Sequence, residues 1–190
     1  TGTGILYLKD NYPHAGTAFT THATVVGRSL AGNGYPLYEK LNDYNGDTIA
    51  SQFNVLSKQS LEKISAREAD VFTTVSEITA KECAQFHGKN VDIVTPNGFE
   101  DTFVPAGKKF NEKQKTARQK FLQVASAVLN KQVDENAVLI GTSGRYEYKN
   151  KGIDLFIDAL GKLNQAKELK KEVIAFILVP ANNYGPRRSL

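Results

Sequence analysis

Two kinds of segment alternate along the chain, and their hydrophobic patterns differ. Short apolar, β-branched runs predict strands at residues 18–24, 69–75, 91–95, 137–141 and 173–179. Stretches with apolar residues at helical spacing lie between them, at about residues 49–67, 76–87, 110–130 and 152–163. This alternation is typical of α/β units with parallel strands. The unbroken apolar runs of the last two strands predict that both are buried.

The best-marked helix is the one over residues 76–87. Ser76 is a plausible N-cap, and Gly88 is a natural residue to end the helix. Cys83 falls on its inner face, while His87 stands at its end, where we expect solvent. As the only cysteine, Cys83 cannot form an internal disulfide, which suits a reducing compartment, and we expect a cytoplasmic location. A thiolate metal cluster is excluded for the same reason.

Residues 99–108 predict a linker, because they contain Pro105 and Gly107 and show little periodicity. We therefore expect two domains, over residues 1–102 and 103–190. Their charges differ: residues 1–100 carry eight basic and eleven acidic side chains, and residues 101–190 carry sixteen and nine. A basic half suits a phosphorylated ligand, a nucleic acid or a membrane surface, although lysine-rich solvated helices explain it equally well. No run reaches the roughly 18 apolar residues of a membrane helix, so we expect no membrane partner.

The most informative loop for chemistry follows the predicted strand at residues 137–141. Ligands of open parallel sheets bind beyond the carboxyl ends of the strands. Here Gly144 allows a close backbone approach, Arg145 can bind two phosphate oxygens, and Lys151 adds a point charge before a helix N-terminus. The loop thus favours a diphosphate ligand. The alternative is that Arg145 and Lys151 form surface ion pairs with Glu147, Asp154 or Asp158. Neither the GxxxxGK[ST] nor the GxGxxG phosphate motif is present.

Two further candidates follow strands in the first half. His22 lies after Phe19-Thr-Thr and could hydrogen-bond a sugar hydroxyl or a carbonyl, although a lone histidine at a strand end is more often structural. Asn97 lies in Thr95-Pro-Asn-Gly98, which reads first as a tight turn and second as a ligand contact. The histidine spacing does not resemble a metal site, and no nucleophile constellation is evident.

Four motifs resemble one known family. They are Phe19-Thr-Thr-His-Ala-Thr24, Val71-Phe-Thr-Thr-Val-Ser-Glu-Ile-Thr-Ala80, Asp92-Ile-Val-Thr-Pro-Asn-Gly98 and Gly144-Arg-Tyr-Glu-Tyr-Lys-Asn-Lys-Gly152. In this order and at about these intervals they are similar to glycogen synthases of the animal and fungal type. The resemblance covers most of the 190 residues.

That resemblance implies a GT-B fold, in which two Rossmann-like lobes face a cleft. It implies retaining transfer of glucose from UDP-glucose to the non-reducing end of an α-1,4-glucan, without a metal ion or other cofactor. By their positions, Arg145 and Lys151 look like the pair that neutralises the donor diphosphate, with Gly144 beside them. His22 looks like the histidine near the transferred glucose, and Asn97 is similar to a nucleotide-sugar contact on the hinge side.

The resemblance also implies that parts of the enzyme are absent. The chain has no methionine, and we expect it to hold only the back of lobe one and the front of lobe two. Such a piece should be inactive alone and should self-associate as a homo-oligomer through open sheet edges and apolar faces.

Three alternative functions remain at this point, and one of them, a non-catalytic scaffold derived from an enzyme, is weakly opposed by the presence of Arg145 and Lys151. Another GT-B enzyme, of the sucrose or trehalose synthase kind, would share the diphosphate loop, but Thr20-Thr-His-Ala-Thr24 and Tyr146-Glu147-Tyr148 argue against it. A basic nucleic-acid-binding module would need aromatic residues among exposed basic ones, whereas Phe110 and Phe121 align with the aliphatic face of their helix and look like core. We therefore expect no nucleic acid partner.

Overall fold

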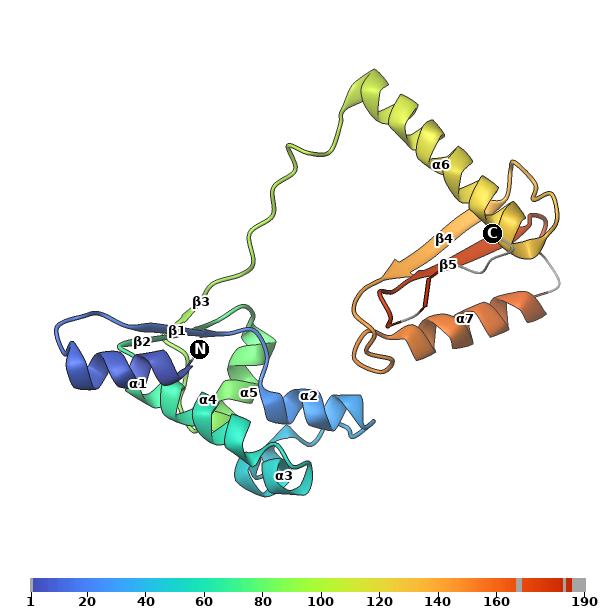
Figure 1. The fold of residues 1–190 in the computed structure, drawn as a ribbon. Helices are drawn as coiled ribbons and strands as arrows, with labels where there is room; N and C mark the ends of the chain where they lie inside the picture. The colour runs from blue at the N-terminus through green and yellow to red at the C-terminus, as the bar shows by residue number, and fades with distance from the viewer. Residues whose placement is uncertain (1, 167–168, 183, 186–190) are drawn as a thin grey trace. The chain divides into compact units, whose positions relative to one another are not determined.

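The computed structural model describes residues 2–166, 169–182 and 184–185. The chain divides into two compact units, Thr1–Gly98 and Phe99–Leu190. Each unit is α/β with a parallel sheet, as the sequence pattern predicts (Figure 1). Among the helices of the described residues, none has the length and apolar character needed to cross a membrane.

The first unit is a three-stranded parallel sheet with helices between its strands. Its elements are α1 (Gly2–Asn11), β1 (Ala18–Thr21), α2 (Val25–Gly32), a 3-10 turn η1 (Leu41–Asp43), α3 (Gly46–Gln52), α4 (Leu56–Glu68), β2 (Val71–Thr74), α5 (Glu77–His87) and β3 (Ile93–Val94). The strand order is β1-β2-β3. Phe19 of β1 lies opposite Phe72 of β2, and Thr73 of β2 lies opposite Ile93 of β3. Parallel pairing brings the carboxyl ends of all three strands to one edge.

One hydrophobic cluster of this unit lies where α4 and α5 cover the sheet, and another joins α2, α3 and α5. Phe72 is fully buried, and its ring stacks on that of Phe19 with the centroids 5.8 Å apart. Ala66 of α4 and Cys83 of α5 pack against Phe72. Burial raises the pKa of the Cys83 thiol to about 12, so the thiol is protonated and inert at neutral pH. The expected inner position of Cys83 is therefore confirmed.

Local capping decides where several of these helices begin and end. As predicted, Ser76 caps α5 by accepting the Thr79 N–H, and Gly88 ends it in the left-handed region at φ 65°. The single helix expected over residues 49–67 is wrong, because Asn54 at φ 56° separates α3 from α4. The strand expected over residues 18–24 ends at Thr21, because Thr24 caps α2 instead.

The second unit consists of two parallel strands between two helices. Its elements are α6 (Gly107–Leu129), β4 (Val138–Ser143), α7 (Ile153–Gln165) and β5 (Val173–Leu178). Figure 1 shows α6 on one face of the strand pair and α7 on the other. On the α6 face, Ala125 packs with Val133, Ala137 and Ile174. The Phe121 ring meets that of Phe176 with centroids 4.8 Å apart.

This second core is smaller than the sequence suggests. Both strands were expected to be buried, yet among the described residues of β4 and β5 only Ile174 is. Phe110 and Phe121, expected in the core, keep about two fifths of their surface exposed. Two strands and two helices offer too little surface to enclose these apolar residues.

Candidate functional site

The carboxyl edge of the first sheet carries the candidates His22 and Asn97. Thr21, Thr74 and Val94 end the three strands in register. The Thr74 hydroxyl donates to the Thr21 carbonyl at 2.7 Å, and the Thr95 N–H donates to the Thr74 carbonyl at 2.7 Å. His22 follows β1 and Asn97 follows β3, and both are exposed. The structure therefore places these two candidates on the same edge of one sheet.

A hollow of about 250 Å³ lies beside His22. It is lined by Gly2, Phe19, Thr20, Thr21, His22, Leu61, Glu62 and Ser65. Burial raises the pKa of the Glu62 carboxyl. The imidazole, carboxyl and hydroxyl groups around this hollow can donate to and accept from a polyhydroxylated ligand such as a sugar.

The turn that carries His22 is supported by hydrogen bonds to side chains behind it, and the sequence pattern does not identify these side chains. Thr24 Oγ1 donates to Glu82 Oε2 at 2.7 Å, and the Val25 N–H donates to Glu62 Oε2 at 3.0 Å. Thr24 is fully buried and Glu82 is 5% exposed. A glutamate within a hydrophobic face of a helix was the one available signal, and on its own it does not identify the partner.

In the second unit, the loop after β4 carries Gly144, Arg145 and Lys151. β4 ends at Ser143, the loop occupies residues 144–152, and α7 begins at Ile153. Gly152 adopts φ 62° and caps α7 without a side-chain hydrogen bond. The loop is folded by its own backbone: the Lys151 N–H donates to the Glu147 carbonyl at 2.9 Å, and the Ile153 N–H donates to the Tyr148 carbonyl at 3.0 Å. All three candidates therefore belong to one ordered turn at a helix N-terminus.

Arg145 and Lys151 have different surroundings within this loop. The Arg145 guanidinium lies 2.9 Å from a carboxylate oxygen of Glu147, and its side chain is 60% exposed. This is one of the surface pairs that the sequence left open. Lys151 is exposed, and its carbons pass Gly144 closely enough that a Cβ there would lie 3.5 Å from Lys151 Cδ. A Cβ at this distance would be in ordinary van der Waals contact with the lysine stem, so the stem packs directly against Gly144 at the end of β4.

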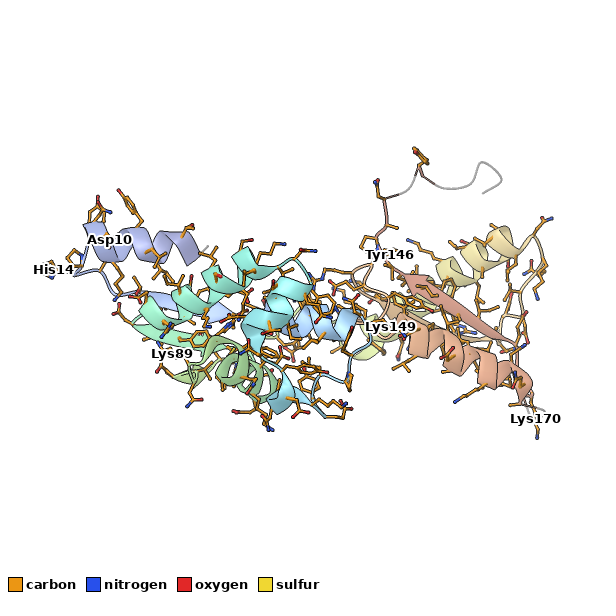
Figure 2. All side chains as sticks on the ribbon, turned by 90° about the horizontal axis from the view of Figure 1, so that it is seen from below. Asp10, His14, Lys89, Tyr146, Lys149 and Lys170 are labelled. Atoms are coloured by element: carbon orange, nitrogen blue, oxygen red, sulfur yellow. The ribbon has the colours of Figure 1, made fainter. Side chains whose placement is uncertain are left out.

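The remaining charges of the loop form a separate ion pair. Lys149, labelled with Tyr146 in Figure 2, donates to an Asp154 carboxylate oxygen at 2.8 Å. This hydrogen bond lowers the pKa of Asp154 and raises that of Lys149. Asp154 therefore pairs with Lys149, and not with Lys151 as the alternative interpretation allowed.

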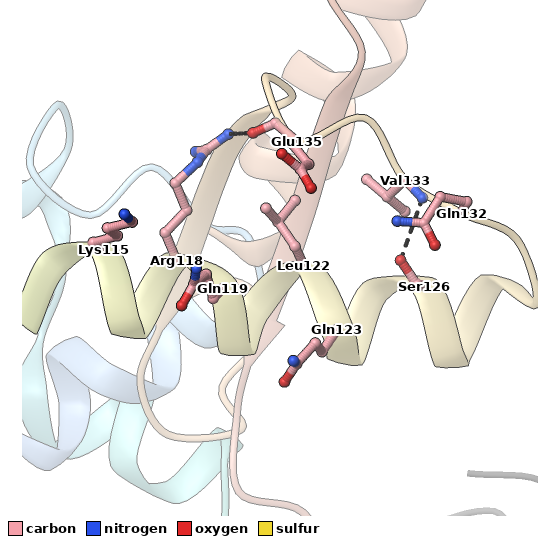
Figure 3. Close-up of a pocket in the computed structure, with 9 residues that line it drawn as sticks. All are labelled: Lys115, Arg118, Gln119, Leu122, Gln123, Ser126, Gln132, Val133 and Glu135. Atoms are coloured by element: carbon pink, nitrogen blue, oxygen red, sulfur yellow. Dashed lines mark hydrogen bonds between the residues drawn. The ribbon is translucent and has the colours of Figure 1, made fainter.

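A larger hollow of about 640 Å³ lies along α6 (Figure 3). Arg118 lines this hollow, and its guanidinium donates to the carbonyls of Glu135 and Ala137, at 2.6 Å each. The Val133 N–H donates to Ser126 Oγ at 3.3 Å. These bonds tie the segment before β4 to α6, so Arg118 has a structural role here. None of the candidate residues lines this hollow.

Within the described residues, no group of three or more His, Cys, Asp or Glu side chains could hold a metal ion.

Comparison with known proteins gives one consistent answer. A family model described as glycogen synthase matches residues 1–185. The chain is 37% identical over 191 residues to a glycogen (starch) synthase of Dictyostelium discoideum, covering 96% of this chain and 22% of that protein. It is 37% identical over 174 residues to glycogen (starch) synthase isoform 2 of Saccharomyces cerevisiae, and this match covers 88% of this chain and 25% of that protein. It is 32% identical over 192 residues to the liver glycogen (starch) synthase of Rattus norvegicus, and this match covers 97% of this chain and 27% of that protein. The chain thus spans about a quarter of the length of these curated relatives.

Proposed function

This chain belongs to the glycogen synthase family, and we propose that it carries donor-binding and catalytic residues of a retaining glucosyltransferase. The donor is UDP-glucose, and the acceptor is the non-reducing end of an α-1,4-glucan. We further propose that residues 1–102 and 103–190 correspond to parts of the two Rossmann-like lobes of a GT-B enzyme. The parallel α/β architecture of each unit supports this assignment.

The loop at residues 144–152 is the observation that carries the proposal. It places an exposed guanidinium and an exposed ammonium group on one turn, between the end of β4 and the N-terminus of α7. The N–H groups of a helix N-terminus attract anions, and a guanidinium can bind two phosphate oxygens at once. A diphosphate presents the charge that this arrangement can neutralise.

The ion pair of Arg145 with Glu147 does not oppose this role. Exposed ion pairs contribute about 0–1 kcal/mol, because water screens both charges. A diphosphate carries more charge than one carboxylate, so it can replace Glu147 as the partner of Arg145.

The proposed chemistry needs charge on the leaving group more than it needs a nucleophile. As the bond between glucose and UDP breaks, negative charge grows on the diphosphate, and Arg145 and Lys151 stabilise it. Preorganised charge of this kind is commonly the largest single contribution to catalysis. His22 lies beside the transferred glucose, where its imidazole hydrogen-bonds the sugar, and Asn97 contributes a contact to the nucleotide sugar. Gly144 leaves room for the phosphates.

A calorimetric titration of the 190 residues with UDP, ADP and inorganic pyrophosphate tests the diphosphate site. We expect saturable binding of UDP, and Arg145→Ala should weaken it at least tenfold, because a charge-assisted hydrogen bond is worth about 1.5–3 kcal/mol. Lys162→Ala is the matched control, since it removes one positive charge from the last turn of α7, at the opposite end of the helix from the loop.

Equal weakening by Arg145→Ala and Lys162→Ala would mean that only net charge matters, and the loop would lose its proposed role. Binding of pyrophosphate as tight as that of UDP would place the diphosphate here without a nucleoside contact.

The transferase activity itself belongs, in this proposal, to a protein of the length of the relatives. We therefore expect the 190 residues assayed alone to incorporate no radiolabelled glucose from UDP-glucose into glycogen. Incorporation above the level seen with Arg145→Ala would contradict this expectation.

A further inference from the structure

We propose that Glu82 is a positioning residue for the transfer reaction, because its buried carboxyl group holds the turn that presents His22. This inference rests on the proposed function, in which His22 lies beside the transferred glucose. Glu82 lies on α5 and does not touch the hollow beside His22, so it acts through the turn and not on the substrate.

The turn is short, and its last residue is anchored. His22 and Ala23 separate β1 from Thr24, the N-cap of α2. Thr24 Oγ1 accepts the Gly27 N–H at 2.9 Å and donates to Glu82 Oε2 at 2.7 Å. At the other side of the turn, the Thr21 hydroxyl donates to the Ala23 carbonyl at 2.9 Å. His22 is therefore exposed on a turn that is fixed by buried hydrogen bonds at Thr24 and by a partly buried one at Thr21.

The carboxyl group that anchors the turn is itself held in place. The Tyr38 hydroxyl donates to Glu82 Oε1 at 2.8 Å, so both carboxyl oxygens accept a hydroxyl. Burial, together with the hydrogen bond to Glu82, raises the pKa of Tyr38 to about 12, which keeps the phenol a donor at any physiological pH. With two partners on two different segments, the carboxyl group has one defined orientation.

The absence of a side chain at Gly27 of α2 leaves the space that the Glu82 carboxyl group occupies. A Cβ added to Gly27 would lie 2.2 Å from Glu82 Oε2 and 2.7 Å from Thr24 Oγ1. Burying a carboxyl group costs free energy that an apolar side chain would not. The arrangement thus favours orientation of the turn over packing stability.

A second carboxyl group supports the same turn from α4. The Val25 N–H donates to Glu62 Oε2 at 3.0 Å, and Glu62 also lines the hollow beside His22. Because Glu62 can touch a ligand there, its variants would mix binding with positioning. Glu82 is the cleaner test, since it lies behind the turn.

The test uses protein of the relatives' length that contains these residues, with kcat and KM for UDP-glucose as readouts. Thr24→Val keeps the shape of the side chain but removes the hydroxyl that reaches Glu82, and Glu82→Gln leaves one acceptor for two hydroxyl donors. We expect both to lower kcat about 10–100-fold with KM changed less than threefold, because misplacing a group by about 1 Å can cost that much. Thr24→Ser should restore kcat.

Tyr44→Phe is the matched control, since it removes a tyrosine hydroxyl of the same unit that donates to the Pro36 carbonyl and not to Glu82. We expect its kcat to stay within threefold of the unchanged protein. In the His22→Ala background, Thr24→Val and Glu82→Gln should lower kcat no further, because their effect passes through His22.

The outcomes separate the two proposals. If His22→Ala leaves kcat unchanged, the role of His22 in the proposed function fails. If His22→Ala lowers kcat but Thr24→Val and Glu82→Gln do no more than Tyr44→Phe, or if their effects add fully to that of His22→Ala, the positioning role of Glu82 is overturned. Thermal melting of each variant detects unfolding, and should Glu82→Gln unfold, the comparison of Thr24→Val with Thr24→Ser decides.

Discussion

The His87 imidazole lies in the core of the first unit, and neither ring nitrogen has a hydrogen-bond partner among the described residues. Its Nε2 is 3.8 Å from Glu62 Oε2, which is longer than a hydrogen bond, and its ring centroid is 6.1 Å from that of Phe72. Burial, with a smaller effect of Lys63, lowers the pKa of His87 to about 4. The ring is therefore neutral at pH 7, and the expectation of a solvated His87 is wrong.

Stability of the first unit should fall as the solution is acidified through the range set by His87. The unfolded chain binds a proton near pH 6.5, while the folded chain resists it down to about pH 4. Stability is therefore complete above about pH 6.5 and is lost progressively as pH falls to 4, by on the order of 3 kcal/mol. Urea unfolding between pH 7 and 4 measures this loss, and His87→Leu should reduce its slope.

Two carboxyl groups of the first unit act differently, and their effects can be separated from that of His87. The raised pKa of Glu62 makes its contribution grow as pH falls, which partly offsets His87. Asp70, whose pKa is lowered to about 2 by the hydrogen bond from Lys9, contributes stability that is lost only below its usual range near 3.8. An identical slope between pH 6.5 and 4.5 in His87→Leu would contradict the assignment to His87.

At the scale of the element, α5 owes its start to one hydroxyl. Ser76 Oγ accepts the Thr79 N–H at 3.3 Å and shares a hydrogen bond with the Thr79 hydroxyl at 2.9 Å. We expect Ser76→Ala to lower the free energy of unfolding by about 1 kcal/mol. Ser60→Ala, at an exposed position of α4, is the control and should be neutral or slightly stabilising. Equal effects in thermal melts would show that Ser76 does not act as a cap.

Elements marked by local chemistry could be predicted from the sequence. The helix α5 has its cap, its inner cysteine and its terminal glycine within thirteen consecutive residues. The break at Asn54 has a weaker marker, because asparagine is unfavourable inside helices and adopts the left-handed region more readily than most residues, as its φ of 56° shows. Burial of β4 and β5 could not be predicted, since it depends on how much surface the neighbouring elements cover.

The same limit applies to the candidate sites. Loop residues such as Arg145 and Lys151 are recognisable because a strand and a helix N-terminus flank them in sequence. Glu82 could not be assigned from sequence, since its partner Thr24 is 58 positions away. His87 is four positions after the buried Cys83, and this helical spacing was an available signal for a shared inner face.

At the scale of the molecule, the strand pair of the second unit leaves apolar surface uncovered. Val124 and Val128 of α6, and Ile177 and Leu178 of β5, each expose more than two fifths of their surface. We expect the 190 residues alone to self-associate at micromolar concentration, because patches of this kind drive association. In sedimentation velocity, Val124→Lys combined with Ile177→Lys should shift the protein toward monomer, whereas Lys substitutions at the polar positions Gln123 and Gln165 should not.

The pairing of β1 with β2 has a consequence for how the chain folds. Thr20 and Thr73 join across 53 positions, and among the described residues β1 has no other partner strand. At about 5–20 residues per second, roughly 3–10 seconds of synthesis separate the two strands. During that interval α2, α3 and α4 leave the ribosome and can assemble through local contacts, while the backbone of β1 remains unpaired. Translation therefore produces these helices before β2, and β1 can pair with β2 to form the sheet that carries the His22 turn only after β2 is synthesised.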